Sequence, residues 1–475
     1  MLVPFASIPI IAQTYGADKL AIWLLVLQVS RLMRLLNLGL NNSLIRFLAK
    51  PAFEKNTNEI SEILSTTLIT LVTIGLFILL VSLTLYYNIL EVDAGLKQYI
   101  VIPLVFISIG MPFQVGYGSL AATKNFALIA FFNIFAQVGW LSALLLFYVY
   151  VSVSFEIVIL TYFIIFILKD ISLLWFGQKK LAFPPIRLRY YSRSMLGKIL
   201  SISVAALALT ASATLLRQGG PLWLGMKFEV TFITQAALPL LVLFGLAPFI
   251  NVLSQLIMPT AAIKNNDKDL YNLKNDIIFS ARYTMIFATL LLVVSTYTAD
   301  TVFSWWLGSS LPEKTVSSIV DYFLWLFYFY TLMAPSILFR SVLVSIGKHW
   351  QTTSFESICN IIGFVAGIIL TVFITSSAGG VIYGVCAAFV LRAIGLNQHL
   401  IRKHFSIRSY DLFKAVYFLP ILMMVSQWIT TSLITNHPNL QNQIMISQVF
   451  ILGYLLVLSV EQDHWNLVKR MIRKL

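Results

Sequence analysis

Two arginines inside one long apolar stretch are the strongest candidates for binding chemistry in this sequence. Arg31 and Arg34 are three residues apart, a spacing that places both on one face of an α-helix. Two guanidinium groups on one face suit a phosphate-bearing anion. Gln28 lies one turn earlier and would extend that face with an amide able to bind a sugar. The competing interpretation is structural, with the arginines forming an interhelical ion pair with Asp170 or Glu356.

Further charged residues lie in or beside apolar stretches. Lys169 and Asp170 are adjacent, so their side chains leave a helix about 100° apart and we expect them to have different partners. Binding and structural roles are both open for this pair. Arg217 follows another apolar stretch and could reach the same cavity as the first arginines. Arg46 and Lys124 lie in polar loops, where they could contact a phosphate at the mouth of a cavity or face anionic lipid head groups.

Other polar residues have simpler explanations. Asn133 and Gln137 are one helical turn apart, which is typical of interhelical hydrogen bonding in membranes. Four charged residues lie near the expected ends of helices, and we predict that they are solvated; they are Glu229, Asp321, Glu356 and Arg392.

The sequence has no pattern typical of an enzyme or a metal site. Its five histidines lie mostly in loops, without a His-Glu-x-x-His or a phosphate-binding Gly-Lys-Ser/Thr pattern. Cys359 and Cys386 lie in apolar stretches, and we expect small buried side chains rather than a disulfide or metal ligands. We therefore predict no enzyme activity, no metal and no cofactor. Any energy input would come from an ion gradient or from downstream consumption of a product.

The composition places the whole chain in a membrane. Of its 475 residues, 59% are hydrophobic and 11% are charged, whereas soluble domains carry about 25% charged residues. A charged side chain at the centre of a membrane helix costs about 2.5–3.5 kcal/mol on insertion scales, which makes the charges above worth explaining. The net charge of +14 does not indicate nucleic acid, because an excess of Lys and Arg is normal in the cytoplasmic loops of membrane proteins.

The predicted fold is all-α and polytopic, with about fourteen transmembrane helices. Their approximate cores are 1–13, 20–44, 63–87, 99–120, 126–150, 155–178, 195–216, 230–258, 281–299, 319–342, 353–374, 381–400, 412–434 and 445–460. Lys and Arg gather in alternate loops, at 46–55, 124, 179–198, 264–282, 348 and 402–414, and in the tail at 469–474. The positive-inside rule then predicts that these loops and both termini are cytoplasmic.

A weak internal repeat predicts two pseudo-symmetric six-helix lobes. Tyr15-Gly16 opens the second span as Leu224-Gly225 opens the eighth, and Pro112 precedes Lys124-Asn125-Phe126 much as Pro335 precedes Lys348-His349-Trp350. The predicted division is an N-terminal lobe at 1–180, a basic cytoplasmic linker at 181–194, a C-terminal lobe at 195–405, and two extra helices with a basic tail at 406–475. The first span, 1–13, is about half a helix, which indicates either a start upstream or a shortened first helix.

An ordered set of short motifs resembles one family of membrane proteins, the O-antigen and polysaccharide flippase branch of the multidrug/oligosaccharidyl-lipid/polysaccharide (MOP) exporter superfamily. The motifs are Pro4, Tyr15-Gly16, Leu36-Asn37-Leu38-Gly39-Leu40 with Ile45-Arg46, Trp306-Leu307-Gly308 and Gly347-Lys348. They cover nearly the whole chain in order. Asn37 departs from the family, which commonly has an acidic residue there, so a carboxylate role in ion coupling at that position is in doubt.

The resemblance implies two six-helix bundles facing a central cationic cavity and alternating between inward-open and outward-open states. Its implied cargo is an undecaprenyl-pyrophosphate-linked oligosaccharide repeat unit, moved from the cytoplasmic to the periplasmic leaflet of a bacterial inner membrane. In that setting Arg46 and Lys124 would lie at the cytoplasmic mouth. The implied partners are this lipid-linked glycan, membrane lipid and other polysaccharide assembly proteins.

Three alternatives remain open. A cation-coupled multidrug exporter shares the superfamily but would favour acidic residues in its cavity, whereas the excess here is basic. A lipid II flippase would also need a cationic cavity. A membrane polymerase or ligase acting on the same glycan ranks third, because such enzymes usually carry a sizeable periplasmic loop and every predicted periplasmic loop here is short.

Overall fold

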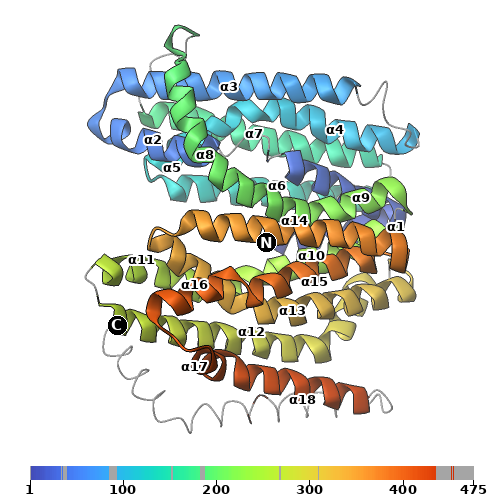
Figure 1. Cartoon of the computed structure of the whole chain (residues 1–475). Helices are drawn as coiled ribbons and strands as arrows, with labels where there is room; N and C mark the ends of the chain where they lie inside the picture. Colours follow the sequence, from blue (N-terminus) through green and yellow to red (C-terminus); the bar gives the residue numbers. More distant parts are fainter. Residues whose placement is uncertain are drawn as a thin grey trace. The chain divides into compact units, whose positions relative to one another are not determined.

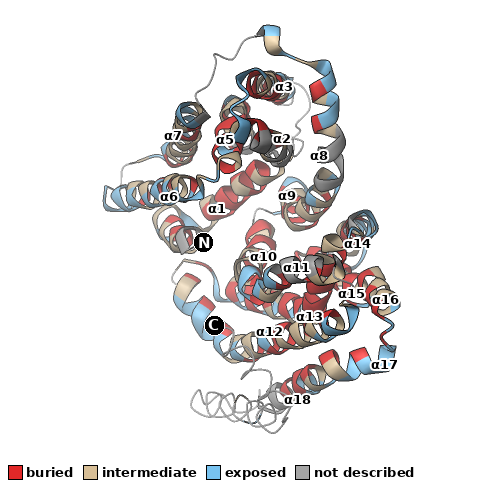
Figure 2. Ribbon diagram, turned by 90° about the vertical axis from the view of Figure 1, so that its left-hand side faces the viewer, coloured by how far each residue is buried: buried red, intermediate tan, exposed pale blue. Residues whose placement is uncertain are grey.

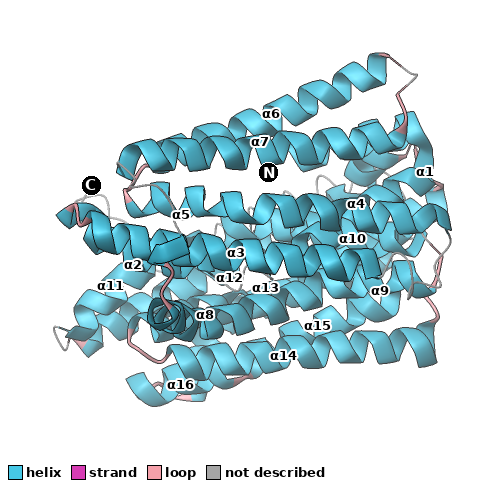
Figure 3. Ribbon diagram, turned by 90° about the horizontal axis from the view of Figure 1, so that it is seen from above, coloured by secondary structure: helices cyan, strands magenta, loops and turns pink. Residues whose placement is uncertain are grey.

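The computed structural model describes residues 2–33, 35, 40–84, 94–150, 153–181, 188–229, 231–266, 269–308, 310–434, 451 and 453. Within these ranges every regular element is a helix (Figures 1 and 3). The α-helices are α1 (Leu2–Met33), α2 (Leu40–Glu54), α3 (Thr57–Thr84), α4 (Ala94–Gly110), α5 (Val115–Ala122), α6 (Phe126–Val149), α7 (Phe155–Leu181), α8 (Arg193–Thr214), α9 (Gly220–Lys227), α10 (Thr231–Ile250), α11 (Val252–Asn266), α12 (Leu270–Leu307), α13 (Glu313–Ser345), α14 (His349–Leu370), α15 (Gly379–Ile394), α16 (Leu396–Phe405), α17 (Ser409–Leu412) and α18 (Phe418–Ile434).

The expected all-helical membrane fold is confirmed. Among the described residues, eleven helices are long and apolar enough to cross a membrane. They do not reproduce the predicted number of fourteen. The first predicted span and most of the second, 20–33, fall within α1, α8 is not among the eleven, and the last predicted span, 445–460, lies almost wholly outside the described residues.

The helix α1 is two helical segments that meet at Gly16. This glycine has φ 86° and ψ 171°, a backbone conformation that is essentially restricted to glycine. A straight helix would separate Phe5 from Gln28 by about 35 Å, at 1.5 Å per residue. Both residues line the same pocket, so the chain must fold back at Gly16. The expected break at Tyr15-Gly16 is therefore present, and it has a backbone cause.

Side chains on both sides of this turn anchor it to other helices. The Tyr15 hydroxyl donates to the carbonyl of Val153 (3.1 Å), just before α7. The Lys19 ammonium donates to the Tyr99 hydroxyl in α4 (2.9 Å), and that hydroxyl donates to the Glu156 carboxylate in α7. The turn is thus linked to two neighbouring helices, which fixes the direction in which the second segment of α1 leaves it.

Contacts divide the chain into two compact units. The first comprises Met1–Gly245, Trp306–Tyr322 and His349–Ala388, and the second comprises Leu246–Trp305, Phe323–Lys348 and Phe389–Leu475. This division does not test the predicted lobes at 1–180 and 195–405, which stay a prediction. Both pockets described below belong to the first unit.

In the first unit, the buried core contrasts with the exposed apolar side of α6. Buried side chains from α2, α3 and α8 pack together, among them Leu44, Ile63 and Ile199. By contrast, half of the residues of α6 are exposed (Figure 2), and most of these are large and apolar, as in Phe131 and Phe135. An apolar exposed face is what a helix needs when its surroundings are lipid.

The close packing of α14 on α15 depends on small residues. Gly363 and Gly367 in α14, and Gly380 and Gly384 in α15, each form a Gly-x-x-x-Gly pattern. A Cβ added at Gly384 would come within 2.4 Å of the Gly363 carbonyl oxygen. Glycine is therefore required there so that the two helix backbones can approach, as is common between membrane helices.

The second unit contains polar contacts between helices. In this unit Asn251 donates to the Tyr330 hydroxyl (2.5 Å), and Lys264 in α11 forms an ion pair with Asp276 in α12 (2.6 Å). The Lys264–Asp276 pair joins α11 to α12, and both residues lie in the expected basic segment 264–282. These contacts stabilise the unit and contribute to neither pocket.

Two helix endings compared in the predicted repeat share one geometry, at positions one residue apart from those that were aligned. Lys124 (φ 59°) ends α5 as Gly347 (φ 86°) ends α13. In both turns the amide of this residue donates to the carbonyl three residues earlier (3.0 and 3.1 Å), and the next amide donates to the carbonyl five residues earlier (2.9 and 2.8 Å). This is the Schellman helix ending. Lys124 thus matches Gly347 and not Lys348, and both lie twelve residues after their prolines, Pro112 and Pro335.

Candidate functional site

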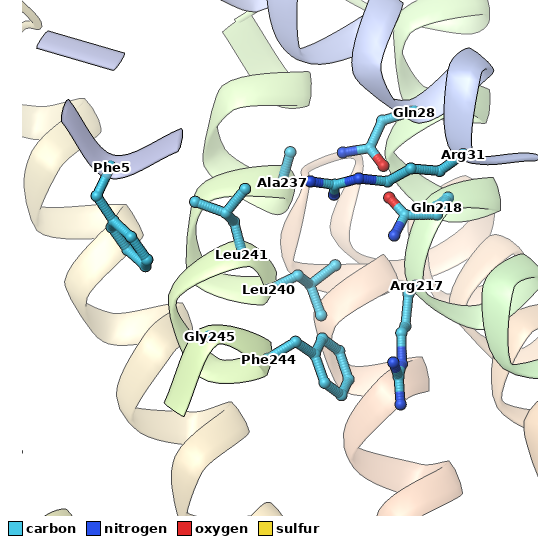
Figure 4. A pocket seen from close by; sticks show the side chains of 10 residues that line it. All are labelled: Phe5, Gln28, Arg31, Arg217, Gln218, Ala237, Leu240, Leu241, Phe244 and Gly245. Carbon is cyan, nitrogen blue, oxygen red and sulfur yellow. The ribbon is translucent and has the colours of Figure 1, made fainter. Parts of the chain in front are cut away.

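A pocket in the first unit brings together three of the predicted binding residues. It has a volume of about 260 Å³, and we call it the arginine pocket (Figure 4). Its lining residues are Phe5, Gln28, Arg31, Arg217, Gln218, Ala237, Leu240, Leu241, Phe244 and Gly245. Gln28 and Arg31 lie one turn apart on α1, whereas Arg217 is distant in the sequence, so its meeting with them at one pocket is a product of the fold.

The ends of helices position the polar groups of this pocket. Arg31 lies in the last turn of α1, with Gln28 one turn before it. We expected Arg31 near the middle of a span, but α1 ends at Met33 and α2 begins only at Leu40. Arg217 lies in a π-helical turn, Leu215–Gly219, that joins α8 to α9. Such turns are frequent at functional sites.

The arginine pocket is electropositive. None of the described residues that line it is acidic, and two are arginines. Figure 4 shows the Arg31 guanidinium beside Gln28 and Ala237, whereas the Arg217 guanidinium extends along Phe244. The Arg217 guanidinium carbon lies 3.7 Å from the centre of the Phe244 ring, a cation–π contact that holds this charge in place. The pocket therefore offers two separate cationic groups.

Gln28 adds an uncommitted hydrogen-bonding group to this pocket. Its side chain is only 3% exposed, and its amide oxygen Oε1 is buried without a hydrogen-bond partner in the described part of the chain. A buried polar atom without a partner costs about 1–3 kcal/mol. The predicted role of this amide in binding a sugar stays a prediction.

The remaining predicted arginines cannot be assigned to the pocket. Arg34 lies outside the described residues, and for Arg46 the structure describes the helix α2 but not the side chain. Lys124 is exposed in the turn that ends α5. The roles of Arg34, Arg46 and Lys124 in binding stay predictions.

A second pocket of the first unit lies among α1, α4, α5, α6 and α7, and we call it the aromatic pocket. It has a volume of about 300 Å³. Its lining residues are Ser30, Phe106, Ile107, Gly110, Gln114, Tyr117, Asn133, Tyr162, Phe163, Phe166, Ile167, Lys169, Asp170 and Leu173. Five of these fourteen residues are aromatic, which gives this pocket a different chemistry from the arginine pocket.

The expectation that Lys169 and Asp170 have different partners is wrong. Their side chains form an ion pair with each other, with 2.8 Å between Nζ and Oδ1. The reason is the length of lysine, because a four-carbon side chain can bend around the helix to reach the carboxylate of its neighbour. Both residues line the aromatic pocket, where their charges offset each other.

The prediction that Glu356 and Arg392 are solvated is also wrong. Glu356 in α14 is fully buried (0% exposed), and Arg392 in α15 is 6% exposed. Both lie near helix ends in the sequence, but helix packing covers them. Asp321 and Glu229 are exposed, as expected.

The aromatic residues of the second pocket could not be predicted from the sequence. Tyr117 and Tyr162 are ordinary residues of apolar spans, and nothing in their spacing marks them as a pair. Gln218 was also missed, although its position next to Arg217 was an available signal. Only the packing of the helices shows that these three residues line pockets.

The described residues contain no group of three or more His, Cys, Asp or Glu side chains that could hold a metal ion. Both cysteines are buried and free, which confirms that they are not a disulfide. The polar chemistry of the two pockets consists of guanidinium, amide, hydroxyl and ion-paired groups.

No protein-family model matches the chain, and no curated protein sequence matches it significantly. Solved structures do resemble its fold. The lipid II flippase MurJ in an inward closed conformation has a TM-score of 0.69 at 13% identity, covering 96% of each chain. A multidrug resistance MATE family transporter of the MOP superfamily in an inward-facing conformation has a TM-score of 0.68 at 14% identity, covering 87% of this chain and 95% of that one. An outward-facing MATE structure has a TM-score of 0.56 at 15% identity, covering 85% and 94%.

These likenesses establish the fold. The chain has the multi-pass helical architecture of MOP superfamily transporters and flippases. The structural neighbours include both a lipid II flippase and multidrug resistance transporters, so the fold alone does not identify a cargo.

Proposed function

We propose that this protein is a flippase that moves undecaprenyl-pyrophosphate-linked oligosaccharide repeat units from the cytoplasmic to the periplasmic leaflet of a bacterial inner membrane. The observation that carries the proposal is the arginine pocket, in which Arg31 and Arg217 contribute two positive charges and no described lining residue is acidic. Guanidinium groups bind phosphate oxygens in a bidentate manner, so a diphosphate suits the pocket.

The charge of this pocket argues against a cationic drug as cargo. Moving a cationic drug into a site with two arginines would place like charges together in a medium of low dielectric constant, where their repulsion is strong. An anionic head group would instead be attracted. The Gln28 amide and the neighbouring Gln218 add neutral hydrogen-bonding groups at the same wall, which suits a diphosphate that carries a sugar.

Alternating access is the mechanism that we propose for this movement. Structures with the same fold have been recorded in inward-facing and outward-facing conformations. In the proposed cycle the diphosphate enters the arginine pocket from the cytoplasmic side, and the lipid tail remains in the bilayer. Its release to the periplasmic side follows a change of conformation.

A lipid II flippase is the second candidate, because the likeness to MurJ extends over 96% of each chain. Both candidates require the same recognition of a lipid diphosphate. They differ in the group that the diphosphate carries, so a test that varies this group separates them.

The test is complementation of flippase-deficient cells that supply candidate repeat units, with surface glycan as the measured quantity. We expect the wild type to restore surface glycan. Arg31→Ala and Arg217→Ala should each reduce it at least about 10-fold at equal membrane levels, because a charge-assisted hydrogen bond contributes about 1.5–3 kcal/mol. The matched control is Lys314→Ala, which removes an exposed cation of the first unit outside the pocket.

Three outcomes would contradict the proposal. Normal surface glycan in both arginine variants would make these residues structural. Failure of the wild type with every glycan, combined with drug resistance, would assign the protein to multidrug export. Rescue of cells depleted of their lipid II flippase, without rescue of surface glycan, would favour the second candidate.

A further inference from the structure

The aromatic pocket lies beside the arginine pocket on the same helix, and the proposed function leaves it without a role. Ser30 lines the aromatic pocket, whereas Gln28 and Arg31 line the arginine pocket. Adjacent residues point about 100° apart on an α-helix, so the two pockets open on different faces of the last two turns of α1. The two pockets are therefore separated by only one or two residues along α1.

The aromatic pocket is not suited to binding an anion by charge, as the arginine pocket is. Lys169 and Asp170 are the only charged residues that line it in the described part of the chain, and they pair at 2.8 Å. Their charges offset each other, so the pocket has no net attraction for a phosphate or for a cationic drug. The ligand best suited to it is a neutral group.

The aromatic side chains of this pocket form a packed array. The Tyr162 ring contacts Phe166 (4.6 Å between ring centres) and Phe163 (5.3 Å), and it packs against Trp23 (5.0 Å) and Trp140 (5.2 Å) outside the pocket. Packing on several sides holds these rings in place before any ligand binds. Aromatic faces carry partial negative charge, and they suit the weakly positive C–H face of a sugar ring.

Hydrogen-bonding groups lie among these rings. Within the described ranges, no hydrogen bond uses the Asn133 amide or the Tyr162 hydroxyl, and both residues are half-buried. The ion-paired Asp170 carboxylate retains acceptor capacity, since a carboxylate has about four lone-pair sites. Sugar hydroxyls both donate and accept, so they can satisfy all three groups. Pockets that combine apolar walls with a few polar groups are typical ligand sites.

We propose that the aromatic pocket binds a neutral sugar residue of the glycan whose diphosphate occupies the arginine pocket. This inference rests on the proposed function, because it assigns the second part of the same cargo. The volume of about 300 Å³ is at the lower end of the roughly 300–1,000 Å³ of ligand pockets, and so it suits a single sugar residue. The aromatic pocket would then select among glycans that share one diphosphate.

The test measures binding of two kinds of probe to the purified full-length protein in detergent. One is bare undecaprenyl diphosphate. The other is the same lipid carrying one neutral sugar, drawn from a panel of hexoses and N-acetylhexosamines. The ratio of the two affinities is the sugar gain. We expect at least one sugar to give a gain above about 3-fold, and Asn133→Ala to reduce that gain about 3- to 10-fold, the effect of one hydrogen-bonded group.

The control for Asn133→Ala is Gln137→Ala, which removes an amide one turn away on α6 that does not line the pocket. It should leave the sugar gain unchanged. A second variant, Tyr162→Phe, keeps the packed ring and removes only the hydroxyl, so it tests the pocket without disturbing the array. It should reduce the gain about 2- to 5-fold and leave binding of the bare lipid unchanged.

The outcomes separate the two proposals. If bare undecaprenyl diphosphate does not bind, or binds independently of Arg31, the proposed function fails. If it binds through Arg31 but no sugar of the panel gives a gain, or the gain survives both Asn133→Ala and Tyr162→Phe, the inference about the aromatic pocket fails alone.

Discussion

The arginine pocket and the aromatic pocket differ in charge although they share a helix. Arg31 and Arg217 make the first pocket electropositive, whereas the Lys169–Asp170 pair makes the second neutral. Phe244 supports a guanidinium in the first, and in the second the aromatic rings themselves form the wall. This difference indicates a division of labour, in which one pocket binds by charge and the other by shape and hydrogen bonding.

Reversing the charge of the arginine pocket should have the largest effect. We expect Arg31→Glu to weaken binding of bare undecaprenyl diphosphate more than about 100-fold, because it replaces an attractive contact by repulsion at low dielectric constant. The measurement is equilibrium binding to purified protein. Lys314→Glu makes the same reversal at an exposed position and should change the affinity less than about 3-fold. Similar losses in both variants would attribute the effect to overall charge and remove the contrast between the pockets.

Raising the salt concentration should weaken binding in the arginine pocket more than in the aromatic pocket, and this effect should be smaller than that of charge reversal. Raising the ionic strength from about 0.1 M to 1 M shortens the screening length from about 10 Å to about 3 Å. Binding of the bare lipid should therefore weaken about 3- to 10-fold, since it depends on partly exposed charges. The additional affinity given by a neutral sugar should stay within about 2-fold, because the groups that bind it carry no net charge. A sugar contribution as sensitive to salt as the diphosphate contribution would contradict the division.

The smallest effect is expected from removing the aromatic ring that contacts the Arg217 guanidinium. Phe244→Leu removes the ring beneath the guanidinium, and the loss of a cation–π contact of about 0.5–1 kcal/mol predicts about 2- to 5-fold weaker binding of the bare lipid. Phe249→Leu is the matched control, because Phe249 is exposed on the same helix, α10, and lines neither pocket. Equal binding by the Phe244 variant and wild type would show that Arg217 does not need this ring.

The single residues of the arginine pocket were more predictable than those of the aromatic pocket. Charge in an apolar span is conspicuous, so Arg31, Gln28 and Arg217 could each be named from the sequence. Tyr117 and Tyr162 could not, because aromatic residues are common in membrane helices and their type carries little information. The pairing of Lys169 with Asp170 was also misjudged, since helix geometry gives the direction of a side chain's first bonds but not where a long side chain ends.

The internal repeat stays a prediction, but the structure changes which residues of its two turns correspond. Two prolines and two lysines suggested corresponding turns, and the structure has corresponding Schellman endings at Lys124 and Gly347. Lys348 looked equivalent to Lys124 because side-chain type was compared. The true equivalence is one residue earlier, since what the two turns share is a backbone conformation with positive φ. Lysine can adopt it at some cost, and glycine adopts it freely.

The sequence by itself determined that this protein is a multi-helical membrane protein, because 59% hydrophobic residues and long apolar stretches leave no other way to satisfy the backbone. It also determined which charges needed an explanation. Only the tertiary structure decided which of them meet. The fold-back at Gly16 places Phe5 in the same pocket as Gln28. The packing of α7 places Lys169 and Asp170 in the same pocket as Ser30 of α1. The physical reason is that composition and periodicity act locally along the chain, whereas a binding pocket depends on the packing of helices distant in sequence.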